Sequence, residues 1–148
     1  MQDTYSLQRF VDAQAPVIDQ VLEELREGRK RSHWMWYVFP QLRGLGHSAM
    51  AQAYGISGLD EARAYLAHPV LGARLRECAT LVAAVQERGI HEIFGSPDDM
   101  KFRSSMTLFT HADPGELAFQ ECLRKYFGGQ VDALTEARLR RDAGSANL

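Results

Sequence analysis

Residues 29–46 combine aromatic rings, positive charges and glycines more densely than any other part of the sequence. The segment reads Arg-Lys-Arg-Ser-His-Trp-Met-Trp-Tyr-Val-Phe-Pro-Gln-Leu-Arg-Gly-Leu-Gly and contains both tryptophans of the chain. Aromatic faces beside fixed cations can bind a planar anion such as a nucleotide, because stacking and charge-assisted hydrogen bonds then act on the same molecule. The same composition also suits a buried core element with a solvated, positively charged rim.

A ligand at this segment would meet its polar edge and one of its two indole rings. The candidate ligand-binding residues here are Arg31, Ser32, His33, Trp34, Trp36 and Gln41. The turn at 44–46 extends the argument, because glycines let a backbone approach a phosphate. A Gly-x-Gly pattern lacks the third glycine of a dinucleotide-binding loop, so an ordinary turn is the favoured interpretation.

A second polar group occurs in the string Lys-Phe-Arg-Ser-Ser-Met-Thr-Leu-Phe at residues 101–109. On a helix, Lys101, Ser104 and Ser105 would share one face beside an apolar stripe. They would then form the polar wall of a pocket. The other wall would be residues 29–46, here called the tryptophan segment. The alternative is that Ser104 and Ser105 are small residues that permit close helix packing.

Neither a metal site nor a cofactor is predicted from the remaining reactive residues. Helical zinc sites pair histidines at i, i+4, and no such pairing occurs among His33, His47, His68, His91 and His111. Of these, His33 is placed for an acid–base or hydrogen-bonding role. Cys78 and Cys122 are predicted to be buried free thiols. Asp98 and Asp99 follow Ser96 and Pro97, and helix capping accounts for these two acids.

Composition restricts the protein to a few classes. The chain has 148 residues, of which 45% are hydrophobic and 24% charged, so a single globular domain is expected. A net charge of -2 argues against a general nucleic-acid binder, because such proteins carry a broad basic surface. Neither a leader of basic and then apolar residues nor a long apolar run is present, which predicts a cytoplasmic protein with no membrane segment.

Hydrophobic spacing predicts an all-α fold, a compact single domain of about seven helices with no substantial sheet. One apolar stripe recurs along residues 18–25, and Gly28 follows it as a candidate C-cap. The longest helix is predicted from Pro69 to Arg88, and Ser96-Pro97-Asp98-Asp99 begins another that runs to about Thr110.

The other expected helices are shorter. They cover residues 7–14, 48–54, 59–67, 113–127 and 132–142, which places the helical domain at 1–142 and a flexible C-terminal tail at 143–148. Residues 34–39 are apolar all round as a helix and on both faces as a strand, so both conformations stay open. In either conformation this segment must be largely buried.

Several strings of the sequence are similar to one known family. They are Leu-Gln-Arg-Phe-Val-Asp-Ala-Gln at 7–14, Ser-His-Trp-Met-Trp within 32–41, the segment 59–75, and Phe-Arg-Ser-Ser-Met-Thr-Leu-Phe at 102–109. Together they resemble the bacterial family known as domain of unknown function 1810, over roughly residues 6 to 135. The resemblance implies a mainly α-helical single domain and carries no activity, cofactor or catalytic residue.

Two functions from different classes follow from these residues. The first is the binding of an anionic, nucleotide-like or otherwise phosphorylated small molecule between the tryptophan segment and the Lys101 helix. An ADP-ribose- or NAD-linked hydrolase is its enzymatic form, although the residues identify no reaction. The second is a non-catalytic protein–protein interaction domain in which the aromatic segment and the Arg29-Lys30-Arg31 run contact an unidentified protein partner.

Overall fold

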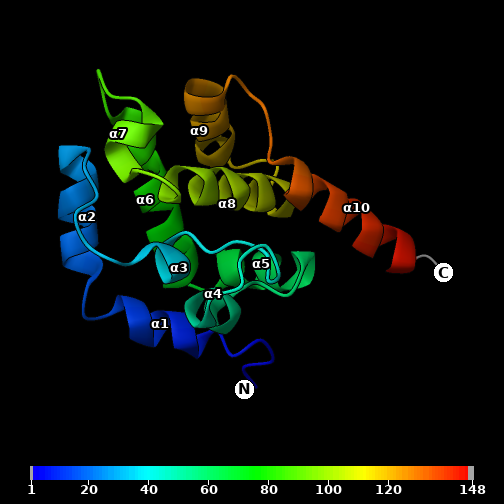
Figure 1. Ribbon diagram of the computed structural model, residues 1–148. Helices are drawn as coiled ribbons and strands as arrows, with labels where there is room; N and C mark the ends of the chain where they lie inside the picture. Colours follow the sequence, from blue (N-terminus) through cyan, green and yellow to red (C-terminus); the bar gives the residue numbers. More distant parts are fainter. Residues whose placement is uncertain (1, 147–148) are drawn as a thin grey trace.

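The computed structural model describes residues 2–146, which form an all-helical fold, as the hydrophobic spacing predicts. Ten helices occur in this range, a few more than the expected number of about seven (Figure 1). They are α1 Gln8–Gln14, α2 Ile18–Glu27, α3 Met35–Val38, α4 Ala49–Tyr54, α5 Leu59–Ala67, α6 Leu71–Ala84, α7 Ile90–Phe94, α8 Asp98–Ala112, α9 Leu117–Phe127 and α10 Ala133–Ala146. Strand pairing within the described range is limited to an isolated parallel bridge between Leu42 and Ile56.

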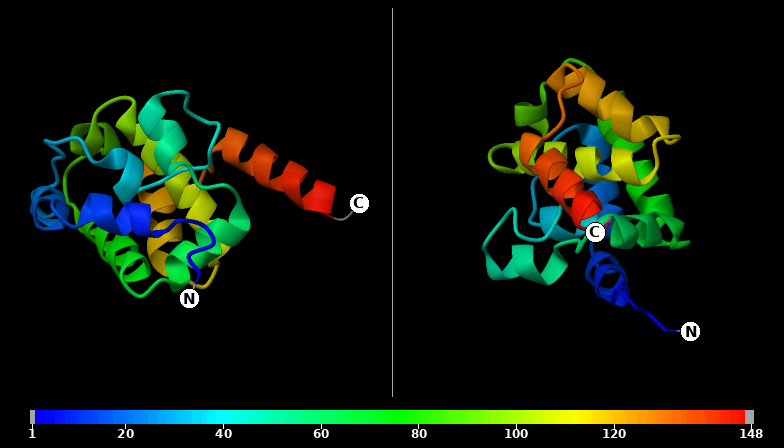
Figure 2. Two further views of the ribbon diagram at one scale, coloured as in Figure 1. Left: turned by 90° about the horizontal axis from the view of Figure 1, so that it is seen from below. Right: turned by 90° about the vertical axis from the view of Figure 1, so that its right-hand side faces the viewer.

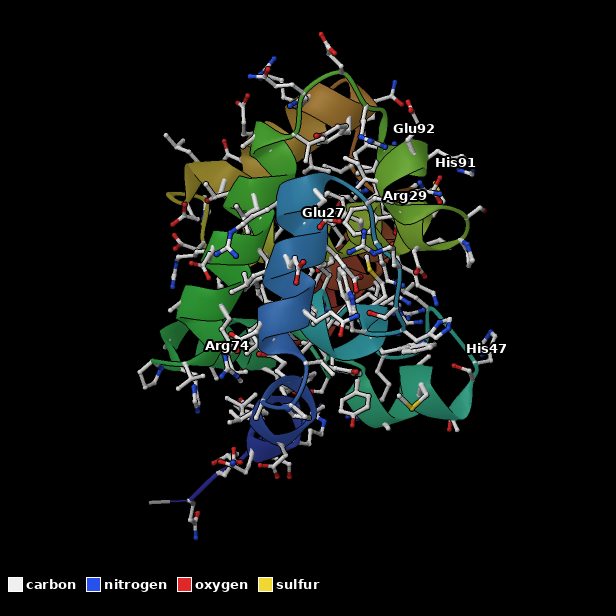
Figure 3. The ribbon with its side chains drawn as sticks, turned by 90° about the vertical axis from the view of Figure 1, so that its left-hand side faces the viewer. Glu27, Arg29, His47, Arg74, His91 and Glu92 are labelled. Atoms are coloured by element: carbon white, nitrogen blue, oxygen red, sulfur yellow. The ribbon has the colours of Figure 1, made fainter. Side chains whose placement is uncertain are left out.

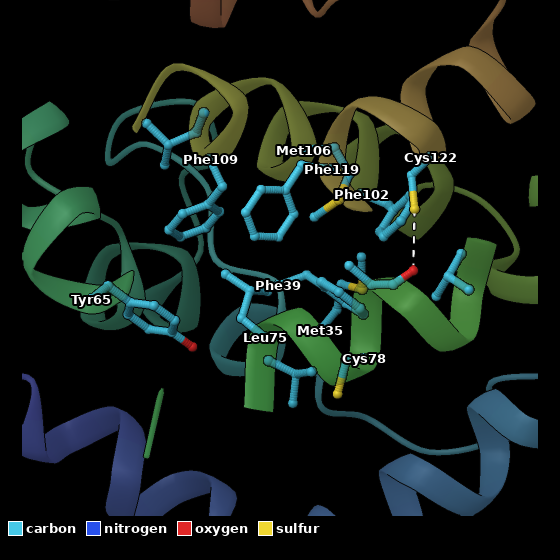
Figure 4. Close-up of a cluster of buried hydrophobic side chains, with 14 of the residues drawn as sticks. Met35, Phe39, Tyr65, Leu75, Cys78, Phe102, Met106, Phe109, Phe119 and Cys122 are labelled. Atoms are coloured by element: carbon cyan, nitrogen blue, oxygen red, sulfur yellow. Dashed lines mark hydrogen bonds between the residues drawn. The ribbon is translucent and has the colours of Figure 1, made fainter. Parts of the chain in front are cut away.

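The hydrophobic core lies where α6 and α8 meet their neighbours. Helix α6 packs against α2, α5 and α9, whereas α8 packs against α5, α7, α9 and α10. Figure 4 shows Leu75 of α6 directed toward side chains from α3, α5 and α8. Such side chains contribute roughly 1.5 to 3 kcal/mol each when fully buried, before entropy is subtracted, so α6 and α8 act as the central supports of the fold.

Local signals in the sequence account for several helix ends. Helix α2 ends at Gly28, whose φ of 74° is left-handed and whose N–H bonds the carbonyls of Glu24 and Leu25. Ser48 accepts a hydrogen bond from Ala51 N at 3.1 Å and begins α4. Asp132 accepts one from Thr135 N at 3.0 Å and begins α10. These three helix boundaries confirm the sequence predictions.

The predicted end of α6 and the predicted start of α9 are wrong. Helix α6 ends at Ala84, four residues before the predicted end at Arg88, because side chains of α9 bind its last carbonyls. The Tyr126 hydroxyl donates to Val82 O at 2.6 Å, and Lys125 Nζ donates to Ala83 O at 2.7 Å and to Val85 O. Helix α9 begins at Leu117 rather than at residue 113, because residues 113–116 form a turn.

Residues 34–39, for which both helix and strand were possible, contain a helix. Residues 35–38 form the single turn α3, and Trp34, Met35, Val38 and Phe39 are all buried, which confirms the predicted burial. The chain then continues through a long connection that contains α4, and the bridge between Leu42 and Ile56 pairs the two ends of this connection. Arg9 fixes this connection, since its guanidinium donates to Ala53 O at 2.9 Å and Gly55 O at 3.1 Å.

Helix α10 extends away from the rest of the molecule, as the left view of Figure 2 shows. Its first half is attached to α8, where Asp132 N donates to Thr107 Oγ1 at 2.9 Å and His111 bonds Glu136. The helix continues to Ala146 and therefore includes residues 143–146 of the segment predicted as a tail. Residues 147 and 148 lie outside the described range. None of the helices in residues 2–146 has the length and apolar character needed to span a bilayer.

Gly72 lets α5 and α6 approach each other closely. A Cβ at this position would lie 2.1 Å from Leu66 O and 2.8 Å from Arg76 Nη1. We expect Gly72→Ala to lower the free energy of unfolding by about 2 kcal/mol, because the two helices must separate to admit the methyl group. Thermal unfolding followed by circular dichroism would measure the loss. Gly144→Ala is the control, since that glycine has open space around it and alanine favours a helix; equal melting temperatures for both variants would contradict the expectation.

Candidate functional site

A recess lies between the 30–36 loop and the amino end of α8, and its volume is about 410 Å³. The side of the molecule that carries this loop is drawn in Figure 3, where Glu27 and Arg29 lie at the end of α2 near His91 and Glu92 of α7. The loop is fastened to α7 by a hydrogen bond of 2.7 Å from Lys30 N to Ile93 O. The recess is lined by Lys30, Arg31, Ser32, His33, Met35, Trp36, Phe94, Ser96, Pro97, Asp98 and Lys101.

The buried carboxylate of Glu24 shapes the loop that forms one wall of this recess. It accepts hydrogen bonds from Arg31 N at 2.8 Å, from Ser32 Oγ at 2.6 Å and from Trp34 Nε1 at 3.0 Å. Gln20 Nε2 and Ser32 N add two further donors. Burial would raise the pKa of Glu24, but these hydrogen bonds outweigh it and lower the pKa from 4.5 to about 2. A charged Glu24 therefore fixes the backbone of residues 31–34.

Two ammonium groups and one carboxylate meet inside the recess. Lys30 Nζ lies 2.9 Å from Asp98 Oδ2, and the Lys30 side chain is only 7% exposed. Lys101 Nζ lies 3.7 Å from Asp98 Oδ1, one turn further along α8. Arg31 adds a third cation at the rim, where it pairs with Glu27. The lining of the recess therefore carries more positive than negative charge.

The two tryptophans occupy different environments. Trp34 is 1% exposed, so its ring belongs to the core and faces Phe39 and Phe94. Trp36 is only partly buried and contributes to the wall of the recess, with Lys101 Nζ 5.1 Å from its ring centroid. Of the two indoles proposed as a stacking surface, Trp36 is thus the one that a ligand can reach.

The structure brings five of the nine predicted binding residues to the recess: Arg31, Ser32, His33, Trp36 and Lys101. The hydroxyl of Ser32 is engaged by Glu24. Gln41 lies next to the recess, in a shallow depression of about 10 Å³ that shares Trp36 and Lys101 with it.

The serine pair on α8 does not line the recess. Ser104 Oγ donates to Met100 O at 3.2 Å within its own helix. Ser105 is fully buried, and its hydroxyl has no hydrogen-bond partner among residues 2–146. The polar wall is therefore made by Lys101 and Asp98, one turn nearer the start of the helix.

The glycine turn also lies outside the lining of the recess. Gly44 has a left-handed φ of 97° and packs against Arg138 of α10. Arg138 Nη1 donates to Arg43 O at 3.0 Å, so this turn connects α10 to the rest of the fold.

Among the charged residues of the recess, sequence reasoning missed Lys30 and Asp98. Lys30 belonged to a run interpreted as solvated, and Asp98 was assigned to helix capping. Their ion pair joins residues 68 positions apart (98 minus 30), so no local pattern signals it.

The buried free thiols are confirmed at Cys78 and Cys122, and burial raises the pKa of each to about 12. Within residues 2–146 no cluster of three or more His, Cys, Asp or Glu side chains is arranged to hold a metal ion.

Comparison with known proteins identifies relatives without a described activity. The family model with the description "Protein of unknown function (DUF1810)" matches residues 4–139. The chain is also similar to the conserved hypothetical protein Rv1873 from Mycobacterium tuberculosis, of which a crystal structure is known. The two sequences are 59% identical, the match covers 93% of this chain and 99% of the mycobacterial one, and the TM-score is 0.92. No curated protein matches the chain.

Proposed function

The chain belongs to the DUF1810 family of proteins of unknown function, and we propose that it binds an anionic, nucleotide-like or phosphorylated small molecule in the recess before α8. One observation carries the proposal. The ammonium of Lys30, with a side chain only 7% exposed, shares a single recess with Lys101 and the accessible indole of Trp36. Enclosing a lysine costs solvation; the ion pair with Asp98 offsets part of this cost, and a bound anion would offset more of it.

The charges around the recess favour an anion. Three cationic side chains line it against a single carboxylate, and the amino end of the 15-residue helix α8 adds a partial positive charge. The volume of about 410 Å³ lies within the range of roughly 300 to 1,000 Å³ that is typical of small-molecule sites. The indole face of Trp36 supplies an apolar surface on which a base or sugar ring can stack.

Hydrolysis of an ADP-ribose or NAD linkage is the enzymatic form of this proposal. It would draw on His33 and Asp98, because an imidazole and a carboxylate line the same recess and both can transfer protons. Incubation with ADP-ribose or NAD and detection of the released nucleotide or nicotinamide would test this step separately from binding.

The alternative of a protein interaction domain has less support at this segment. Trp34, Met35 and Phe39 are buried and cannot anchor a partner. Two cations of the basic run are engaged within the chain, Lys30 by Asp98 and Arg31 by Glu27. The large apolar side chains with the greatest exposure are instead Leu117 and Leu134, on α9 and α10.

The proposal predicts that Lys30→Met weakens ligand binding by about tenfold to a hundredfold. A hydrogen bond to a charged group contributes roughly 1.5 to 3 kcal/mol, and each 1.4 kcal/mol is a factor of ten. A thermal-shift screen of AMP, ADP-ribose and ribose 5-phosphate would first select the ligand that stabilises the protein most. Isothermal titration with that ligand would then measure the loss of affinity in Lys30→Met.

Arg141→Met is the matched control, because it removes one positive charge from an exposed position on α10 outside the recess. Its affinity should equal that of the unmodified protein. Quenching of the indole fluorescence by the ligand should also disappear in Trp36→Phe. A screen in which no anion raises the melting temperature would refute the proposal, as would equal affinities for the Lys30 and Arg141 variants.

A further inference from the structure

Asp98 places a negative charge at the centre of a site whose other charges attract anions. Both of its carboxylate oxygens are engaged, Oδ2 by Lys30 at 2.9 Å and Oδ1 by Lys101 at 3.7 Å. The Asp98 side chain is 19% exposed, so solvent screens it only in part. An anion that reaches either ammonium must therefore approach this carboxylate as well.

This arrangement discriminates against simple anions. A free phosphate would be attracted by the two ammonium groups but repelled by Asp98. Like charges at contact distance in a partly enclosed site repel strongly. Hydroxyl groups on the same ligand would change this balance. An ionised carboxylate offers about four lone-pair positions, and the two lysines leave some of them free for donors in the recess.

We infer that the ligand of this recess is a phosphorylated sugar or nucleotide with a free vicinal diol, whose hydroxyls donate to Asp98 while Lys30 and Lys101 bind the phosphate. The inference rests on the proposed function and specifies its ligand class. Two adjacent hydroxyls match the two oxygens of one carboxylate, and the indole of Trp36 borders the same space. Asp98 thereby selects against anions that bring no donor of their own.

The test compares two ligands that differ only in the diol, AMP and 2′,3′-dideoxyadenosine monophosphate. Titration calorimetry on the unmodified protein should show AMP binding at least about tenfold more tightly, since a hydrogen bond to a charged group is worth that factor or more. In Asp98→Asn the two affinities should converge. The same variant should bind inorganic phosphate about tenfold more tightly than the unmodified protein, because the repelling charge is gone.

Asp99→Asn is the matched control for this experiment. Asp99 lies in the same first turn of α8, but its carboxylate faces His91 and Met100 N and does not line the recess. This variant loses the same charge and should keep the preference for AMP. The comparison of the two ligands on the unmodified protein requires no variant, so it decides the inference even if Asp98→Asn does not fold.

The outcomes separate this inference from the proposed function. Equal affinities of the unmodified protein for AMP and its dideoxy analogue would contradict recognition of the diol. They would not contradict the proposed anion site. An unchanged phosphate affinity in Asp98→Asn would overturn the selective role of the carboxylate. If no phosphate compound binds either the unmodified protein or Asp98→Asn, both the proposed function and this inference are wrong.

Discussion

Leu75→Asp is expected to abolish the native fold. Leu75 is 1% exposed and lies in the middle of α6, where Figure 4 shows it among the core side chains. Removing a buried leucine costs about 2 to 5 kcal/mol, and placing a carboxylate there without a partner adds several more. The total approaches or exceeds the 5 to 15 kcal/mol by which domains are typically stable.

Circular dichroism and size-exclusion chromatography would detect the loss of helix and of compactness in this variant. Thr80→Asp introduces the same charge at an exposed position of the same helix and should leave both measurements unchanged. Leu75→Met conserves volume and should cost less than about 1.5 kcal/mol. A cooperative melting transition in Leu75→Asp near that of the unmodified protein would show that α6 does not support the core.

Glu24→Ala should have the second largest effect on stability. The fully buried carboxylate accepts five hydrogen bonds, and the indole N–H of Trp34 is among the donors that alanine would leave unsatisfied. Each buried donor without a partner costs about 1 to 3 kcal/mol, so a loss of about 3 kcal/mol or more is expected in urea denaturation. Glu23→Ala, at an exposed position of the same helix, should change stability by less than about 0.5 kcal/mol.

Glu24 should also make the stability depend on pH in acid. Its folded pKa of about 2 lies below the ordinary value of 4.5, so the unfolded chain binds the proton more readily. The stabilisation is therefore complete above about pH 5 and is lost as the pH falls through the folded pKa, with a total of about 3 kcal/mol. Glu24→Gln should flatten this part of the pH profile. An equally steep acid dependence in that variant would assign the effect to other groups.

Two helix boundaries that depend on neighbouring residues were predictable. Gly28 ends α2, and Asp132 begins α10, because both act on backbone groups within one turn. The end of α6 was not predictable, since Lys125 and Tyr126 come from another helix. Helix α7 was missed because its five residues are too few to show a hydrophobic period.

The candidate site was predictable only in its location. Aromatic and basic residues marked the 31–36 segment, and Lys101 does lie opposite Trp36. The sequence could not reveal that Glu24 binds the backbone of this segment, because a glutamate on a helix resembles any solvated one. It also could not separate the enclosed ring of Trp34 from the accessible ring of Trp36, since only tertiary packing distinguishes two residues so close in the chain.

The way α6 ends has a consequence for how the chain acquires its structure. Its final carbonyls receive their donors from α9, 40 to 44 residues later, so synthesis on the ribosome delivers the helix well before the groups that terminate it. Until α9 docks, water must take the place of the Lys125 and Tyr126 donors at those carbonyls. Because α9 both packs on α6 and supplies these donors, we expect the two helices to form and to unfold together as one cooperative unit.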